Sequence, residues 1–105
     1  MKYDLLVVGA GPAGLTAAIH ARARNKSVLV VSNQPTASPL CKAVQMDNYP
    51  GIPHVNGLDL VERLVAQATD LGAQLRLGRV LSLMNLGDSV MASIGDQVEE
   101  ASAAI

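Results

Sequence analysis

The sequence predicts an α/β fold: a parallel β-sheet with helices, followed by an antiparallel β-meander. Two short apolar runs, at residues 3–8 and 27–31, have the nearly continuous hydrophobicity of strands buried on both faces, and a helix-forming stretch separates them. Three further short segments near the C-terminus are divided by Gly87-Asp88 and Gly95-Asp96, pairs that favour tight reversals. With 105 residues, the chain is the size of one small domain.

The first 32 residues predict a βαβ unit. Residues 3–8 read YDLLVV and stop at a glycine, as a buried strand would. Residues 15–24 are rich in alanine and carry basic residues in the last turn, which favours a helix, and Pro12 suits its start. Residues 25–26 form the turn into a second buried strand at 27–31.

The remaining chain alternates irregular and regular segments. Residues 33–57 hold four of the five prolines and are expected to form a loop; a loop this long in a compact domain is usually functional or disordered. Residues 58–71 have the apolar stripe of an amphipathic helix, which Gly72 is placed to end. Residues 74–77 predict a third strand of the parallel sheet, and 80–86, 89–94 and 97–105 predict the meander.

Composition excludes several classes of protein. Eight basic and nine acidic residues give a net charge of −1 without a basic run, so we expect no nucleic-acid partner. No apolar stretch approaches the roughly 20 residues that span a bilayer, and Met1 to Asp4 lack the start of a secretory signal, so we expect no membrane partner and a cytoplasmic location. The single cysteine, Cys41, excludes an intramolecular disulfide and argues against a cysteine-built metal site.

A glycine motif lies between the first strand and the first helix. In Gly9-x-Gly11-x-x-Gly14, the first glycine permits a tight turn, the second lets a diphosphate approach the backbone, and the third lets helix and strand pack closely. The helix N-terminus then offers unpaired N–H groups and a partial positive charge. This pattern predicts a Rossmann-like fold that binds a dinucleotide, although three glycines could also serve packing alone.

The end of the second strand departs from the usual pattern. An acidic residue normally bonds the adenosine ribose there, but Ser32 and Asn33 occupy the position. Neutral groups make weaker hydrogen bonds than a carboxylate, so we expect a less tightly held dinucleotide. Ser32 and Asn33 could instead make room for a 2′-phosphate, as in NADP, but no Arg or Lys lies close by in sequence to meet its charge.

Two blocks, GAGPAGLTAAIHARARNKSVLVV and DNYPGIPHVNGLDLVERLVAQATDLGAQLRLGRV, together resemble the FAD-binding half of the thioredoxin reductase family. The resemblance covers essentially the whole chain and implies a three-layer FAD-binding fold. It implies that Asn48 lies near the flavin and Val80 near the adenine, and that Ser32 and Asn33 meet the ribose. It also implies that the glycine turn holds the FAD pyrophosphate, through Gly9, Gly11, Pro12, Ala13 and Gly14.

The chain also departs from this family. The family's flavin-contacting Gly-Gly-Gln-Leu segment falls on residues 37–40, where only Leu40 matches. The resemblance therefore implies a flavin contact for Leu40 but not for the three residues before it. The family's Cys-x-x-Cys pair, carried in a second, NADPH-binding domain, is not in this sequence. We therefore expect residues 1–105 to be a single FAD/dinucleotide-binding domain, as a truncated part of a longer two-domain reductase; a naturally shortened relative is the alternative.

The resemblance implies an oxidoreductase that passes electrons from NAD(P)H through FAD to an acceptor, a cycle that this chain alone should not complete. One alternative is a stand-alone module that senses or carries FAD, ADP or NAD(P) without turnover, and another is a structural module with an empty nucleotide site. We assign no catalytic residue: Cys41 and His54 are interpreted as plain loop residues, rather than as a redox nucleophile and a proton donor. An unfinished sheet edge favours a homodimer or other self-association.

Overall fold

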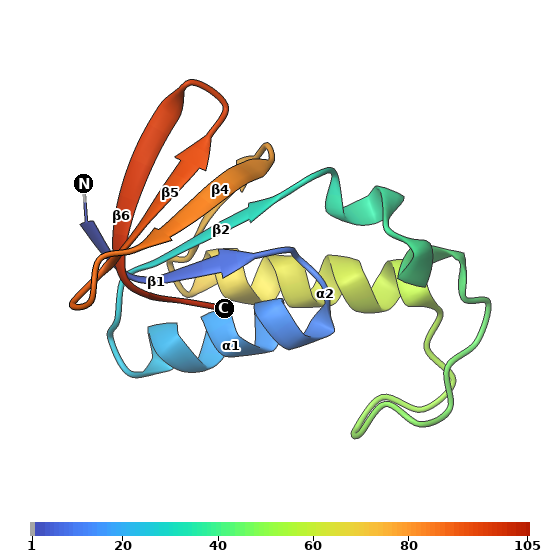
Figure 1. The fold of residues 1–105 in the computed structure, drawn as a ribbon. Helices are drawn as coiled ribbons and strands as arrows, with labels where there is room; N and C mark the ends of the chain where they lie inside the picture. Colours follow the sequence, from blue (N-terminus) through green and yellow to red (C-terminus); the bar gives the residue numbers. More distant parts are fainter. Residues whose placement is uncertain (1) are drawn as a thin grey trace.

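The computed structural model describes residues 2–105, which form one six-stranded sheet in the order β3-β2-β1-β6-β5-β4, with two helices (Figure 1). The first half of the chain contains β1 (Lys2–Val8), α1 (Pro12–Ala23), β2 (Val28–Ser32) and two short 3-10 helices, η1 (Pro35–Ala37) and η2 (Pro39–Lys42). The second half contains α2 (Gly57–Asp70), β3 (Gln74–Leu77), β4 (Val80–Asn85), β5 (Val90–Ile94) and β6 (Gln97–Ala104).

The parallel part of the sheet consists of β3, β2 and β1, and both α-helices cover one of its faces (Figure 1). Side chains alternate along β2, so Val28 and Val30 point toward the helices while Leu29 and Val31 point away. Leu15 of α1 and Leu60 of α2 complete the core on the helical side, and both are almost fully buried. Burial on both faces explains why β2 and residues 5–7 of β1 are continuously apolar.

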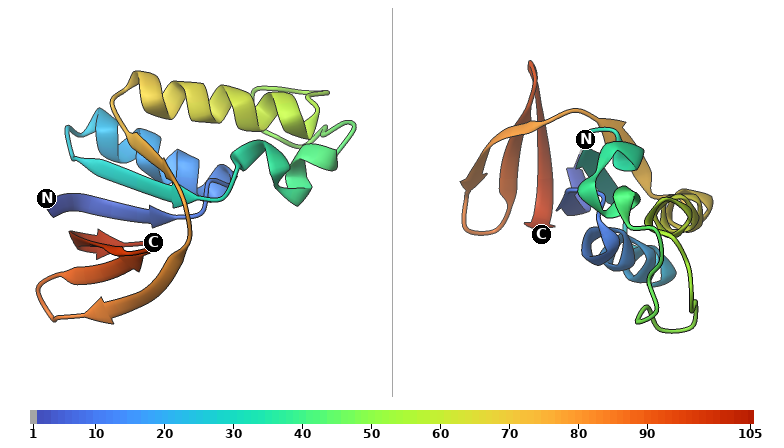
Figure 2. Two further views of the ribbon diagram at one scale, coloured as in Figure 1. Left: turned by 90° about the horizontal axis from the view of Figure 1, so that it is seen from above. Right: turned by 90° about the vertical axis from the view of Figure 1, so that its right-hand side faces the viewer.

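The meander continues the same sheet. Strand β6 pairs in parallel with β1, from Lys2 opposite Glu100 to Leu6 opposite Ala104, and β5 and β4 follow in antiparallel order. Figure 2 shows that these strands turn away from the plane of β1–β3. The meander thereby forms a second apolar cluster on the face opposite the helices, made of Tyr3, Leu6, Leu29, Val31, Ala92, Ile94 and Ala101. This confirms the predicted α/β Rossmann-like fold with a parallel sheet and an antiparallel meander.

The long segment between β2 and α2 contains η1, η2 and a loop that extends away from the sheet (Figure 1). A single bridge between Met46 and Val55 closes the base of this loop. Asn56 then caps α2, because its side-chain oxygen accepts a hydrogen bond of 2.8 Å from the backbone N–H of Asp59. The predicted loop is thus partly ordered by short helical turns, which proline favours at their first position.

Helix α1 begins at Pro12, earlier than the predicted residue 15, because the last three positions of the glycine motif already form its first turn. Its start therefore lies at the carboxyl end of β1, beside the carboxyl end of the parallel neighbour β2. In open α/β sheets, ligands bind at this edge. No helix within residues 2–105 is long and apolar enough to cross a membrane.

Candidate nucleotide-binding site

The glycine turn connects the end of β1 directly to the start of α1. The backbone N–H of Gly9 donates a 2.8 Å hydrogen bond to the carbonyl oxygen of Val31, which fixes the turn against the end of β2. Gly9 has a φ of +102°, a conformation that a residue with a side chain rarely adopts. The first glycine of the motif is therefore required by the backbone of the turn.

The second and third glycines have different surroundings. A methyl carbon placed on Gly14 would lie 2.5 Å from the Gly9 carbonyl oxygen and 2.8 Å from Val7 Cγ1, so helix and strand approach as closely as glycine allows. A methyl carbon placed on Gly11 would meet no atom within 4 Å. Gly14 thus serves packing within the fold, whereas Gly11 borders open space that a ligand can enter.

The first turn of α1 presents backbone N–H groups to this open space. The first amides of an α-helix have no carbonyl partner within the helix, and the N-cap residue, Gly11, has no side chain to accept from them. Pro12 at the first helical position has no N–H, which leaves the amides of Ala13 and Gly14 as donors. No acidic residue lies in the first turn, so nothing there neutralises the positive end of the helix dipole.

A cavity of about 610 Å³ lies beside the glycine turn. Its walls come from the ends of β1 and β2, from the segment around η1, and from the connection between β3 and β4. The lining residues are Val8 to Gly11, Val31 to Pro35, Ala37 to Pro39 and Gly78 to Val80. None of them carries a carboxylate, and Arg79 is the one charged residue among them. The cavity therefore favours an anionic ligand.

Ser32 and Asn33 line the cavity at the end of β2, where the ribose of a dinucleotide is expected. The Ser32 carbonyl oxygen accepts a 2.9 Å hydrogen bond from the Gly78 N–H, which brings the β3–β4 connection against the end of β2. This bond also places Val80, the expected adenine neighbour, in the same cavity. Two segments far apart in sequence thus form one wall of the site.

The structure brings together only part of the predicted set. Gly9, Gly11, Ser32, Asn33 and Val80 line the cavity, and the first turn of α1, with the other three positions of the motif, adjoins it.

Leu40 and Asn48 do not line this cavity. The backbone of Leu40 instead packs closely on Gly57, at the start of α2, so that a methyl group added to Gly57 would collide with the Leu40 carbonyl oxygen. Asn48 is exposed in the extended loop. Their contacts with a flavin stay predictions.

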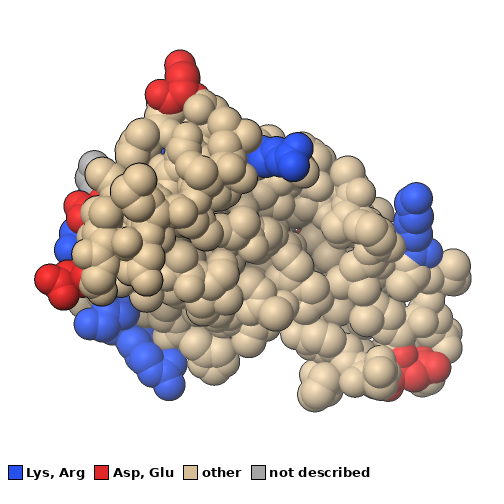
Figure 3. Space-filling view, in the orientation of Figure 1, with Lys and Arg blue, Asp and Glu red and all other residues tan. Residues whose placement is uncertain are grey.

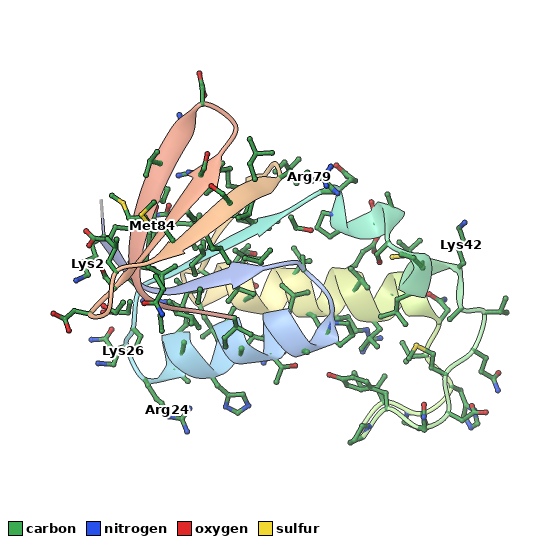
Figure 4. The ribbon with its side chains drawn as sticks, in the orientation of Figure 1. Lys2, Arg24, Lys26, Lys42, Arg79 and Met84 are labelled. Atoms are coloured by element: carbon green, nitrogen blue, oxygen red, sulfur yellow. The ribbon has the colours of Figure 1, made fainter. Side chains whose placement is uncertain are left out.

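Arg79 is a lining residue that the sequence analysis missed. Arg79 is 47 positions from Ser32 in sequence and is brought near it by the pairing of β2 with β3. Figure 4 shows its side chain beside the point where β2 leads into η1. The available signal was its position directly before Val80, which the family resemblance already placed at the adenine.

The two loop residues considered for chemistry lie outside the cavity. His54 Nδ1 is 2.8 Å from Asp47 Oδ1, and both side chains are exposed. Cys41 Sγ contacts Ser38 Oγ at 3.4 Å and the Pro35 carbonyl at 3.5 Å, which are contacts within the 3-10 turns. Across residues 2–105, no group of three or more His, Cys, Asp or Glu residues could hold a metal ion.

These features fit the diphosphate and adenosine of a dinucleotide: an open glycine turn, unpaired amides and an adjoining cavity without carboxylates. Comparison with known proteins agrees. The FAD binding domain family matches residues 4–44. The thioredoxin reductase of Mycoplasmopsis pulmonis is 35% identical over 88 residues, which are 84% of this chain and 29% of that protein.

Solved structures give the same result over nearly the whole chain. Thioredoxin reductase from Streptococcus pyogenes superimposes with a TM-score of 0.91 at 29% identity, covering 98% of this chain and 34% of that one. A ferredoxin-flavin thioredoxin reductase from Clostridium acetobutylicum gives a TM-score of 0.89 at 33% identity, covering 99% of this chain and 36% of that one.

The chain spans about a third of the length of the relatives that it matches. The family match and the structural neighbours identify FAD as the cofactor. In sequence and in fold, the chain is similar to the FAD-binding part of thioredoxin reductases.

Proposed function

We propose that residues 1–105 form a single FAD-binding domain within a longer two-domain oxidoreductase, which passes electrons from NAD(P)H through FAD to an acceptor. The observation that carries this proposal is the open glycine turn at the positive end of α1, facing a cavity without carboxylates. When bound, FAD would supply the hydride and electron transfer chemistry. The chain's own contribution is to bind and orient the diphosphate and adenosine.

Each group has a defined task in this proposal. The N–H groups of Ala13 and Gly14 donate to the diphosphate, and the absence of a side chain on Gly11 lets it approach. Ser32 and Asn33 offer a hydroxyl and an amide to the ribose in place of a carboxylate. Val80 lies against the adenine. Leu40 and Asn48 remain candidates for the flavin end.

Gly11→Val tests the site, because it fills the ligand's space without disturbing the fold. The φ of −83° and ψ of 179° at Gly11 suit a β-branched residue, and the loss of a favourable N-cap residue costs only about 1 kcal/mol. We expect wild-type protein to bind FAD in calorimetric titrations and Gly11→Val to show no binding, while both unfold cooperatively. Ala23→Val adds similar bulk at the far end of α1 and is the matched control.

The alternative function is a nucleotide-binding module without turnover. It is favoured by the extent of the cavity, which covers the diphosphate and adenosine positions but not Leu40 or Asn48. Such a module would be stabilised by ADP as strongly as by FAD. A yellow purified protein that binds FAD more tightly than ADP supports the flavoprotein. If neither nucleotide binds, the structural module with an empty nucleotide site is the correct interpretation.

The electron donor and the assembly state belong to the same proposal. Reduced nicotinamide is the donor that we propose; a ferredoxin-type donor is the alternative that the name of the Clostridium acetobutylicum neighbour suggests. We also propose a cytoplasmic location and self-association through β4, the edge strand of the sheet. Its side chains Leu81, Leu83 and Met84 are all more than half exposed. An exposed apolar edge favours pairing with a second copy.

A further inference from the structure

Arg79 is held at the adenosine end of the cavity by the strands on either side of it. Gly78 donates its N–H to the Ser32 carbonyl oxygen at 2.9 Å, and Val80 pairs with Ile94 at the start of β4. Arg79 lies between these two anchored residues, so its backbone has a fixed place in the cavity wall. It is therefore next to the ribose position.

The guanidinium of Arg79 has no partner of its own in residues 2–105. The two ion pairs of these residues join His54 to Asp47 and Arg76 to Glu99. The guanidinium hydrogen bonds come from Arg22, Arg24 and Arg76. Figure 3, in the orientation of Figure 4, shows an isolated basic group surrounded by uncharged surface at this place. The charge is therefore available to a ligand.

The charge at this end of the site is opposite to the usual one. In dinucleotide-binding folds, a carboxylate after the second strand bonds the ribose hydroxyls and repels a phosphate there, whereas a nearby arginine accommodates a 2′-phosphate. Here the carboxylate is replaced by Ser32 and Asn33, and the single charge in the cavity wall is the cation of Arg79. A guanidinium binds phosphate through paired hydrogen bonds in fixed geometry.

We infer that Arg79 determines specificity at the adenosine end: it binds a phosphate on the adenosine ribose, so the site also accepts 2′-phosphorylated adenine nucleotides, the class that includes NADP(H). This inference rests on the proposed nucleotide site. Such nucleotides compete with FAD for the glycine turn and the cavity, because both ligands place a diphosphate and an adenosine there.

The test compares adenosine 2′,5′-bisphosphate with 5′-AMP in calorimetric titrations of the full chain. The two probes differ by one phosphate on the ribose. For an exposed guanidinium, we expect the bisphosphate to bind about fivefold to tenfold more tightly, with a smaller difference in high salt. Arg79→Gln should remove this preference and weaken bisphosphate binding more than FAD binding, and Arg79→Lys should restore part of the preference because the charge returns.

Arg24→Gln is the matched control, because it makes the same change in net charge at the far end of α1, away from the cavity (Figure 4). It should leave the preference unchanged.

Three results would overturn the inference while leaving the FAD site intact: equal affinity of wild-type protein for both probes, a preference that persists in Arg79→Gln, or equal losses of FAD and bisphosphate binding in that variant. The last result would place Arg79 at the diphosphate. If wild-type protein binds none of these nucleotides, the proposed function fails and the inference fails with it.

Discussion

The packing of α1 against β1 predicts that Gly14→Ala destabilises the fold, although alanine is the better helix former. The added methyl carbon would lie 2.5 Å from a backbone oxygen of Gly9 and 2.8 Å from Val7 Cγ1. The nearest atom is backbone rather than the end of a flexible side chain, and the Gly9 N–H, which donates to the Val31 carbonyl oxygen at 2.8 Å, anchors this residue against β2. The helix must therefore move away from the strand.

The magnitude follows from two opposing terms. Overpacking in a filled core costs about 1–3 kcal/mol, while replacing glycine by alanine in a helix recovers about 0.5–1 kcal/mol. The contacts of 2.5 and 2.8 Å place the overpacking cost in the upper half of its range. We therefore expect the free energy of unfolding to fall by about 1–2.5 kcal/mol, which lowers the Tm of a domain this small by roughly 4–20 °C. For comparison, Gly11→Ala meets no neighbour and should lose about 1 kcal/mol or less, as a poorer N-cap.

Urea unfolding followed by far-ultraviolet circular dichroism measures this difference, since the chain has no Trp to report by fluorescence. The two variants should separate the two functions of the motif. Gly14→Ala loses stability, whereas Gly11→Ala keeps most of its stability but binds FAD more weakly. The reasoning is refuted if Gly14→Ala is as stable as the wild-type protein, or if both variants lose stability equally.

Two further predictions concern other parts of the molecule. The backbone N–H of Ser27 donates to Asp4 Oδ2 at 2.8 Å and holds the pKa of Asp4 below its ordinary value of 3.8. The resulting stabilisation is therefore present above pH 3.8 and is lost as the pH falls through the lower pKa of the folded state. Asp4→Asn should flatten the acid side of a plot of Tm against pH, whereas the control variant Asp88→Asn, in the turn between β4 and β5, should not. If β4 mediates self-association, Leu83→Lys combined with Met84→Lys should lower the sedimentation coefficient to that of the monomer; an unchanged coefficient would contradict an interface at this edge.

Local sequence was sufficient where an element depends on neighbouring residues. The unit β1-turn-α1-β2 could be predicted because apolar runs, glycines and helix formers each act within a few residues. The same holds for α2, whose apolar stripe and stop at Gly72 are local features, and for β3, which was predicted with its observed bounds, Gln74–Leu77. Among these elements, only the start of α1 was misplaced by more than one residue, since Gly14 at the third helical position is a poor helix former that packing makes necessary.

Pairings between distant segments could not be predicted in the same way. Nothing in residues 97–104 distinguishes a third meander strand from one that also pairs in parallel with β1, because a strand pairs with both of its neighbours through backbone groups that every residue carries. The position of Leu40 depends on the close packing of its carbonyl group on Gly57 at the start of α2. The position of Asn48 depends on the loop that the bridge between Met46 and Val55 closes. A family resemblance supplies roles for such residues but not their distances from the cavity.

The two ends of the site therefore differ in how they can be recognised. The proposed diphosphate site is continuous in sequence, from Gly9 to Gly14, and its donors are the backbone N–H groups of a helix N-terminus, which do not depend on particular side chains. The adenosine end is assembled from β2 and the β3–β4 connection, so its charge depends on residues that meet only after the sheet has formed. Arg79 shows the consequence: the absence of an acidic residue after β2 indicated weaker ribose binding, but the compensating cation lies on another strand connection. Whether such a site discriminates between ribose and phosphorylated ribose is thus decided by tertiary structure, not by the glycine motif.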